Sequence, residues 1–292
     1  MINLSFKCNA GKSRQAFTLV EILLVMVIIV IMVGILTPSL VKSRSQAKYV
    51  RWKGYNAGLS RDSEMILNYS FEDKTFKVDG VNALRNEAEG CTASSFKLAA
   101  SHGLIKGGCS WGVGRWSQKN ALQFDGVSGY VEVPDPAPVD FNADDDFTAM
   151  VWVCFDNNLR YEGVFSKSAY EENIAQYDLF HMNDASRNIG GDIQDQAKEA
   201  SAPLTTAGVW YHLALRNRAG VMEIFMDGKL MTLVPGTAGA KQKCSSKLIL
   251  GAIGRTATTY GQYLQGRIDC FGLTKRALTD GDIKGAYQMG AP

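Results

Sequence analysis

The segment Ala16-Phe17-Thr18-Leu19-Val20-Glu21 runs directly into an apolar block that extends from Ile22 to Leu36. Between Phe17 and Leu36 lie roughly twenty residues, the length that a helix needs to cross a hydrocarbon core, and Glu21 is their only charge. In lipid the backbone must satisfy its own hydrogen bonds, so the segment predicts a helix despite its many β-branched side chains. A carboxylate at the head of such a segment is costly, which predicts a dedicated partner for Glu21.

Basic residues flank the apolar block on both sides. The leader carries Lys7, Lys12 and Arg14 and no acid, which favours keeping residues 1–16 in the cytoplasm. The following segment is also basic, with Lys42, Arg44, Lys48, Arg51 and Lys53. Charge counting therefore leaves the orientation open. The second basic run fits a solvated helix face or a contact with anionic lipid headgroups.

The same N-terminal residues resemble the start of type IV prepilins and of the pseudopilins of type II secretion systems. In that family a dedicated prepilin peptidase cuts before the Phe and methylates the new amino group, which implies processing between Ala16 and Phe17. The resemblance implies that Thr18 and Glu21 take part in filament assembly. In this role Glu21 neutralises the N-terminal amine of a neighbouring subunit. Pro38 takes the position of the proline that interrupts the family's long helix. The residue before the cut is usually Gly in this family, and here it is Ala16. Alanine is small enough to fit the peptidase, but it should slow processing.

Two other interpretations explain fewer features of the segment. A secretory signal peptide has a shorter apolar core and is cleaved after that core, not before it. A plain signal anchor would need no acid at Glu21. The prepilin interpretation explains both the order of leader and apolar block and the single carboxylate.

The composition is that of a globular exported domain attached to this segment. The chain has 292 residues, of which 46% are hydrophobic, and a formal net charge of only +2. A nucleic-acid-binding domain would need a clustered basic footprint. We therefore expect no nucleic-acid partner.

The cysteines fit an oxidising compartment. Cys8 lies in the leader, and the other five are Cys91, Cys109, Cys154, Cys244 and Cys270. No pair has the close spacing of a zinc or redox motif. Disulfides with one free thiol are therefore expected, and Cys91 with Cys109 is the preferred pair. Closing the Gly-rich loop between them would contribute about 3 kcal/mol.

The hydrophobic pattern changes period near Ser60. Up to that point it predicts a helix, and beyond it predicts strands throughout. The expected strands are short apolar or alternating runs: Met65–Phe71, Ala121–Phe124, Tyr130–Val133, Phe147–Phe155, Tyr211–Arg216, Val221–Met226, Lys229–Val234 and Lys247–Leu250. Asp227-Gly228 predicts a two-residue hairpin turn. The sequence thus predicts a mainly β protein, with an N-terminal transmembrane helix followed by an antiparallel β-sandwich.

Three segments follow from these boundaries. We expect a leader peptide over residues 1–16, a pilin-like helix over residues 17–60 whose membrane span covers about 17–37, and a β-sandwich head over residues 61–292.

An ordered series of short motifs in residues 65–292 resembles the laminin-G-like, or concanavalin-like, jelly rolls. The series comprises Tyr69-Ser-Phe-Glu-Asp73, Ala121-Leu-Gln-Phe-Asp-Gly126, Tyr130-Val-Glu-Val-Pro134, Trp152-Val153, Gly163-Val-Phe-Ser-Lys167, Val209-Trp-Tyr-His-Leu-Ala214, Met226-Asp-Gly228, Leu250-Gly251, Gly266-Arg-Ile-Asp-Cys270 and Arg276-Ala-Leu278. Phe124, Trp152, Trp210 and Ile268 are expected to pack between the two sheets. His212, which has no accompanying acid or nucleophile pattern, is expected to be structural.

The resemblance also implies candidate ligand sites, because such jelly rolls bind glycans or proteins through rim loops, some with a calcium ion. Calcium is therefore the cofactor that the resemblance implies. Its candidate ligands are Asp79, Asn82 and Asp269, which supply oxygen atoms. The candidate sugar-binding aromatic residues are Tyr260, Tyr263, Trp111 and Trp116. Each of these aromatic residues fits a packing role equally well.

Motifs for catalysis are missing from the sequence. It has no H-E-x-x-H, no G-x-S-x-G and no phosphate-binding loop. A glycosidase would need two carboxylates across a cleft, and no strand carries closely alternating acids. We therefore expect that the chain is not an enzyme.

Together these features predict that the chain is a minor pilin or pseudopilin-like subunit of the bacterial inner membrane. Its N-terminus is expected in the cytoplasm and its head in the periplasm or outside the cell. Its expected partners are the prepilin peptidase, other pilin or pseudopilin subunits, and a glycan or exported protein. The alternative is a membrane-anchored carbohydrate- or protein-binding adhesin that never polymerises.

Overall fold

The computed structural model describes residues 18–89, 101–134, 139–142, 145–157, 160–172, 174–182, 189–193, 197–200, 205–234 and 246–292. The chain forms two compact units, Met1–Arg44 and Ser45–Pro292. The unit boundary lies sixteen residues before the predicted end of the helical segment, so the last turns of the helix belong to the second unit.

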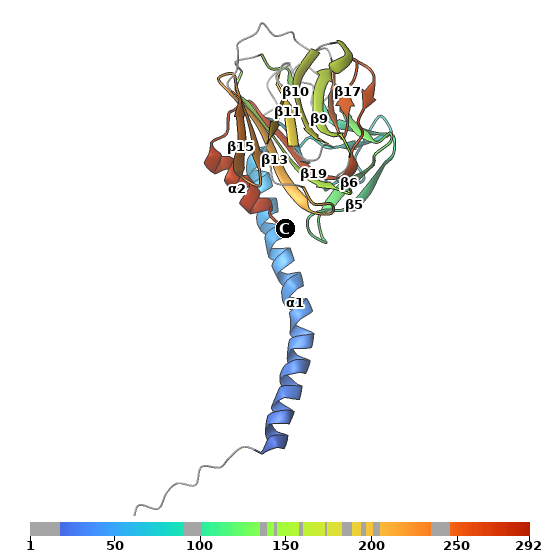
Figure 1. The fold of residues 1–292 in the computed structure, drawn as a ribbon. Helices are drawn as coiled ribbons and strands as arrows, with labels where there is room; N and C mark the ends of the chain where they lie inside the picture. The colour runs from blue at the N-terminus through green and yellow to red at the C-terminus, as the bar shows by residue number, and fades with distance from the viewer. Residues whose placement is uncertain are drawn as a thin grey trace, which may run out of the picture. The chain divides into compact units, whose positions relative to one another are not determined.

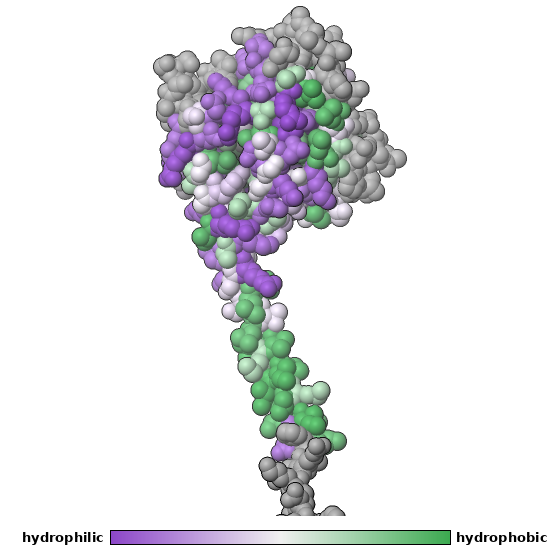
Figure 2. Space-filling model, turned by 90° about the vertical axis from the view of Figure 1, so that its left-hand side faces the viewer, coloured by the Kyte–Doolittle hydropathy of each residue, from purple (hydrophilic) through white to green (hydrophobic). Residues whose placement is uncertain are grey.

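Helix α1 (Leu19–Ser60) confirms the predicted long N-terminal helix. Its side chains from Leu19 to Leu36 are exposed, and Figure 2 shows this stretch as a largely hydrophobic surface. In the described part of the chain, it is the one helix long and apolar enough to span a membrane. Helix α1 continues through Pro38, as the helical pattern up to Ser60 predicts. Proline lacks the backbone N–H that a helix interior uses, and its ring crowds the carbonyl of the residue four positions earlier, which here is Gly34.

Two antiparallel sheets form the second unit (Figure 1). Among the described residues the first sheet has eight strands, in the order β15 (Lys229–Val234), β14 (Val221–Met226), β13 (Trp210–Arg218), β8 (Phe147–Phe155), β19 (Gln265–Thr274), β6 (Asn120–Asp125) and β5 (Cys109–Val113), with β1 (Met65–Tyr69) also paired to β19. The second sheet has nine, in the order β12 (Ala197–Ala200), β11 (Ile189–Asp192), β10 (Ile174–His181), β9 (Glu162–Ala169), β16 (Leu248–Leu250), β7 (Tyr130–Val133), β4 (Gly103–Lys106), β3 (Val81–Leu84) and β2 (Lys77–Val78). A small hairpin joins β17 (Ile253–Gly254) to β18 (Tyr260–Gly261), and a short 3-10 helix, η4, covers Tyr170–Glu172.

The antiparallel β-sandwich is therefore confirmed, and several strands begin and end where the sequence predicts. Phe147–Phe155, Val221–Met226 and Lys229–Val234 agree residue for residue. The hairpin turn between β14 and β15 has positive φ at both Asp227 (51°) and Gly228 (73°), as a type I′ turn requires.

The main hydrophobic core lies between the two sheets. Phe124 and Ile268 belong to it, as predicted. The prediction was wrong for Trp152 and Trp210. Their neighbours Val151, Val153 and Tyr211 belong to the core, and alternate residues of a strand point to opposite faces. Trp152 and Trp210 therefore lie on the outer face of the eight-stranded sheet.

Helix α2 (Asp280–Gly290) corrects the expectation that only strands follow Ser60. Its Ile283 and Ala286 pack with Met150, Ala214 and Phe225 of the eight-stranded sheet in a second buried cluster (Figure 1). Thr279 and Asp282 form a capping box at its start. This Thr-x-x-Asp pattern, an acidic variant of the usual box, was the sequence signal for the helix.

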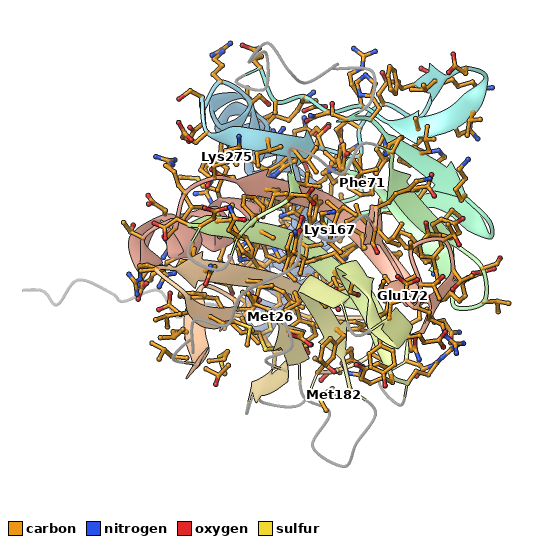
Figure 3. The ribbon with its side chains drawn as sticks, turned by 90° about the horizontal axis from the view of Figure 1, so that it is seen from above. Met26, Phe71, Lys167, Glu172, Met182 and Lys275 are labelled. Atoms are coloured by element: carbon orange, nitrogen blue, oxygen red, sulfur yellow. The ribbon has the colours of Figure 1, made fainter. Side chains whose placement is uncertain are left out.

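Buried cations tie loops to the sheets. Lys167, labelled in Figure 3, lies 2.7 Å from the carboxylate of Asp140 and donates to the carbonyl of Ser246 at 2.6 Å. On the other sheet, Arg216 donates to Glu223 at 2.5 Å and lies 2.8 Å from Asp280 at the start of α2. A buried charge is tolerated when it is paired, so both lysine and arginine fix their neighbouring segments.

Candidate functional site

Thr18 and Glu21, which were predicted to act in assembly, form a capping box at the start of α1. The backbone amide and hydroxyl of Thr18 donate to the Glu21 carboxylate at 2.8 and 2.9 Å, and the Glu21 amide donates to the Thr18 hydroxyl at 3.3 Å. Ala16 and Phe17 lie outside the described residues. In the chain as it stands, Glu21 therefore satisfies the exposed amide at the start of its own helix.

A buried cationic and aromatic cluster holds the last turns of α1 in the second unit. The guanidinium of Arg115 lies 5.5 Å from the ring centre of Trp52 on α1, 4.8 Å from Trp116 and 4.3 Å from Trp152. Arg115 also donates to the carbonyl of Gly290 in α2 at 2.7 Å. One side chain thus connects α1, the loop after β5, the eight-stranded sheet and α2.

Two further cations of α1 reach the C-terminal end of α2. Lys48 donates to a Pro292 oxygen at 2.6 Å, and Arg51 donates to the carbonyl of Gln288 at 2.9 Å. Carbonyls at the end of a helix lack intrahelical partners and carry partial negative charge, so basic side chains stabilise them.

Asp269, a predicted calcium ligand, forms ion pairs with two buried cations. It lies 3.1 Å from Arg115 and 3.2 Å from Lys119, and all three side chains are fully buried. Asp79 and Asn82, the other two candidates, are exposed in and beside the turn between β2 and β3. Across the described ranges, no group of three or more His, Cys, Asp or Glu side chains is placed to hold a metal ion. The structure gives the calcium set no support.

Two of the four predicted sugar-binding aromatic residues come together. The ring of Tyr130 lies 4.8 Å from that of Tyr260 and 6.4 Å from that of Tyr263. Glu132, two residues along β7, accepts from the Tyr260 hydroxyl at 3.2 Å and from Lys247 at 2.8 Å. All five side chains are half-buried. We call Tyr130, Glu132, Lys247, Tyr260 and Tyr263 the tyrosine face.

The two tryptophans do not join the tyrosine face. Trp116 is buried, with 5% of its surface exposed, and packs against Tyr49 and Trp52. Trp111 is half-buried on β5 and packs against the main core. Packing accounts for both residues.

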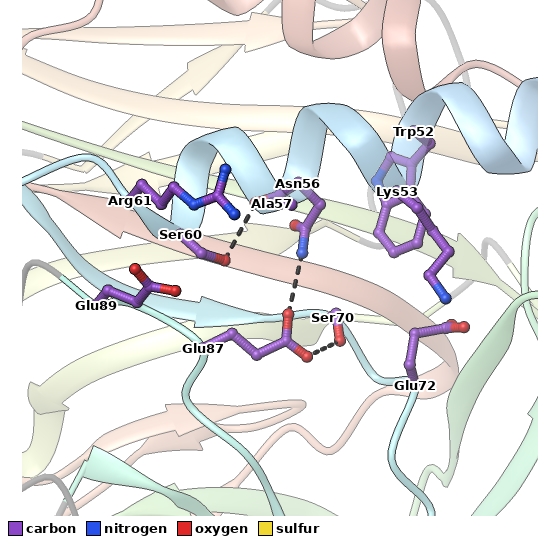
Figure 4. A pocket seen from close by; sticks show the side chains of 10 residues that line it. All are labelled: Trp52, Lys53, Asn56, Ala57, Ser60, Arg61, Ser70, Glu72, Glu87 and Glu89. Atoms are coloured by element: carbon purple, nitrogen blue, oxygen red, sulfur yellow. Dashed lines mark hydrogen bonds between the residues drawn. The ribbon is translucent and has the colours of Figure 1, made fainter.

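A polar cleft of about 360 Å³ lies between the end of α1 and the segments that follow β1 and β3 (Figure 4). Lys53 and Arg61 come from the helix, and Glu72, Glu87 and Glu89 come from the facing segments. Glu87 accepts from Asn56 at 3.1 Å and from the Ser70 hydroxyl, while Glu72 lies 2.9 Å from the buried Lys119. The lining thus carries two basic and three acidic side chains, and one of the acids, Glu72, is already paired with Lys119.

The predicted disulfide remains a prediction without structural support. Cys109 is a free, half-buried thiol whose Sγ lies 3.8 Å from the Tyr130 carbonyl oxygen. Burial is the main cause that raises its pKa to about 12. Cys91 lies outside the described residues. Cys154 and Cys270 are also free.

Two buried acids and one buried histidine have strongly displaced pKa values. Burial raises the pKa of Glu162 to about 7, and burial together with the nearby Asp192 raises that of Asp178 to about 7. Burial and then Arg115 lower the pKa of His212 to about 3, so His212 is neutral. It packs against Trp152 and Tyr287, which agrees with its predicted structural role.

Two sequence families match the chain. Residues 125–284 match the concanavalin A-like lectin/glucanases superfamily, and residues 11–37 match the prokaryotic N-terminal methylation motif. No curated protein matches.

Solved structures share the sandwich at low sequence identity. Domain 4 of AbnA, an extracellular arabinanase from Geobacillus stearothermophilus in complex with arabinotriose, is 14% identical with a TM-score of 0.53, and the match covers 77% of this chain and 98% of that one. The binding domain of Paraclostridial Mosquitocidal Protein 1 is 11% identical with a TM-score of 0.57, covering 78% and 55%. A botulinum neurotoxin type C structure, whose report describes dependence of cell entry on two ganglioside molecules, is 12% identical with a TM-score of 0.53, covering 81% and 53%. This chain spans about half the length of the two toxin chains, and at such identities the likeness concerns the fold alone.

Tyr130, Glu132 and Lys247 were not predicted from the sequence as site residues. Alternation along β7 places Tyr130 and Glu132 on one face of the strand. Lys247, Tyr260 and Tyr263 lie beside them because β7 pairs with β16 and because β18 folds back on β17, contacts that join distant parts of the chain.

Proposed function

The chain belongs to the concanavalin A-like lectin/glucanases superfamily, and on that premise we propose that it is a pilin-like subunit whose jelly roll binds carbohydrate without catalysing its cleavage. The observation that carries the proposal is the combination, in one chain, of an N-terminal methylation motif with a lectin-like domain. The arabinotriose complex and the ganglioside-dependent toxin are consistent with a carbohydrate ligand on this architecture.

The assembly part of the proposal assigns three roles. Prepilin peptidase cuts between Ala16 and Phe17, and the exposed apolar stretch of α1 holds the chain in the inner membrane and then in a filament core. Glu21, which is held by Thr18 in the unprocessed chain, turns to the N-terminal amine of a neighbouring subunit. A carboxylate in an apolar environment gains most from such a charged partner.

The bulk of the head favours a minor or tip subunit. The second unit contains 248 residues from Ser45 to Pro292, and a domain of that size hinders close helical packing of subunits. The head then lies on the exported side of the membrane, where it meets external glycans or exported proteins.

Mass spectrometry of the native protein extracted from membranes tests the processing step. A chain that begins at methylated Phe17 supports the prepilin pathway, and one that still begins at Met1 contradicts it. Cofractionation with sheared filaments then separates an assembled subunit from an anchored lectin that never polymerises. Binding of the intact, detergent-solubilised protein to a glycan array tests the carbohydrate function, and arabinotriose is a natural first probe.

A further inference from the structure

The tyrosine face is built from segments that are far apart in sequence but converge on one outer surface of the nine-stranded sheet. Tyr130 and Glu132 come from β7, Lys247 immediately precedes β16, and Tyr260 and Tyr263 come from β18 and the residues after it. In β7 the alternate residues Val131 and Val133 are fully buried in the core. Tyr130 and Glu132 therefore point away from the core.

The three rings offer an apolar surface that the fold itself does not use. The planes of Tyr260 and Tyr263 are tilted by 52° and 40° from the plane of Tyr130, so the rings form facets and do not close into a stack. None of the three rings belongs to the hydrophobic clusters formed by the described residues. The Tyr263 hydroxyl donates to the Tyr260 carbonyl at 3.2 Å, which fixes the loop that carries both rings.

A carboxylate lies beside the rings in a fixed position. Lys247 and the Tyr260 hydroxyl each donate to a different oxygen of Glu132, at 2.8 and 3.2 Å. An ionised carboxylate has about four acceptor sites, so two of them remain for further donors. Lys247 retains 39% side-chain exposure, which leaves its ammonium group able to donate as well.

The charges on this face indicate a neutral ligand. Lys247 compensates the charge of Glu132, so a cation gains little there. A phosphate or sulfate placed against the rings would approach the Glu132 carboxylate, and like charges at close range repel. Lys106, paired with Tyr130 across the strands, adds one more donor at the edge of the face.

We propose that the tyrosine face is a glycan-binding subsite that takes an uncharged pyranose ring. The ring would place its C–H face on the tyrosines and present adjacent hydroxyl groups to Glu132 and Lys247. This proposal rests on the carbohydrate-binding function proposed above and deepens it by assigning the residues and the ligand class.

The test uses the intact detergent-solubilised protein and two sets of probes. The neutral set is cellopentaose, xylopentaose, mannopentaose and galactopentaose, and the acidic probe is a polygalacturonate pentasaccharide, all by isothermal titration calorimetry at low and high salt. The variants are Tyr263→Ala, Tyr263→Phe and Glu132→Gln. Tyr170→Ala is the matched control, because Tyr170 is a tyrosine with 70% exposure that makes no ring contact with the tyrosine face.

We expect at least one neutral pentasaccharide to bind with little dependence on salt. Tyr263→Ala and Glu132→Gln should each weaken that binding at least tenfold, while Tyr170→Ala stays within threefold of the natural protein. Tyr263→Phe keeps the ring but loses the hydroxyl bond to Tyr260, so it should weaken binding less than Tyr263→Ala does. Because Tyr263→Ala could disturb the loop, nitration of tyrosines followed by peptide mapping gives a second measurement on the unchanged protein. Saturating pentasaccharide should protect Tyr130, Tyr260 and Tyr263 but not Tyr170.

Each contrary outcome has a distinct meaning. Neutral glycan binding that survives Tyr263→Ala and gives no protection would overturn the subsite and leave the proposed function standing. Binding of the acidic probe alone, lost at high salt, would overturn the assigned ligand class. A protein that binds none of a broad glycan array would overturn the proposed carbohydrate function together with this subsite.

Discussion

Arg115 and Asp269 form a two-point ion pair in the interior of the protein. Nε of Arg115 lies 3.1 Å from one carboxylate oxygen of Asp269 and Nη2 lies 3.1 Å from the other, with both side chains fully buried. The Arg115 backbone amide also donates to the same carboxylate at 2.8 Å. These two residues are 154 positions apart, and the pair holds the loop after β5 to strand β19 beneath Trp52 of α1.

Removing one partner of this pair should destabilise the second unit strongly. Asp269→Asn keeps the shape of the side chain but leaves Arg115 and Lys119 buried with an uncompensated charge, a change that costs about 3–5 kcal/mol. Urea denaturation of the fragment 45–292 measures the loss. Arg85→Ala, which breaks an exposed pair with Asp73, is the control and should cost at most about 1 kcal/mol. Equal effects of the two variants would contradict the central role of Asp269.

The end of α1 should be required for the stability of the jelly roll. Trp52 is 4% exposed and packs between Tyr49 and Trp116, so a fragment that begins at residue 61 loses a buried aromatic residue and uncovers Arg115. We expect the fragment 61–292 to melt at least about 10 °C below the fragment 45–292, since large buried aromatic losses cost about 3–5 kcal/mol. Differential scanning calorimetry compares the two. Indistinguishable melting would show that the head is independent of the helix.

The contribution of Glu162 to the stability of the second unit should fall as the pH rises from about 4.5 to 7. The pKa of Glu162 is raised from its ordinary 4.5 to about 7, so the folded protein holds a proton that the unfolded chain has already released. The stabilisation from this carboxyl is therefore fully present below pH 4.5 and is lost as the pH rises through 7. The loss in the free energy of unfolding is at most about 3 kcal/mol. Asp178, whose pKa is also about 7, acts in the same direction.

Glu162→Gln isolates the contribution of that carboxyl. The variant should gain stability relative to the natural protein at pH 8 and lose that advantage at pH 4, measured by urea denaturation at each pH. Glu64→Gln, at an exposed position, should show no such trend. A pH-independent difference for Glu162→Gln would contradict the raised pKa.

Glu21→Ala should leave the head folded but stop assembly. The change removes the carboxylate proposed to meet a neighbouring N-terminal amine and lies outside the second unit. We expect unchanged melting of the jelly roll and at least a tenfold loss of the protein from sheared filaments, measured by quantitative immunoblotting. Glu64→Ala is the matched acidic control and should assemble normally. Normal incorporation of Glu21→Ala would remove the assembly role.

Local sequence signals predicted part of this fold. The membrane-length helix, the strands on either side of Asp227-Gly228 and the sandwich class depend on composition, alternation and turn residues within about ten positions of one another. Strands such as β10 and β11 were not predicted. Helix α2 was also missed, because its 11 residues include three glycines and lack a long apolar period. Its capping box was the available signal.

The sequence by itself determined the methylation motif, the apolar helix and strands such as those on either side of Asp227-Gly228, because each depends on residues that are neighbours in the chain. The tertiary structure alone decided that Asp269 pairs with Arg115 and Lys119 and so has no free oxygen for calcium, that Trp152 lies on the outer face, and that Tyr130, Glu132 and Lys247 meet Tyr260 and Tyr263. Those contacts join residues up to 154 positions apart. Their formation depends on strand order and register, which local periodicity cannot specify.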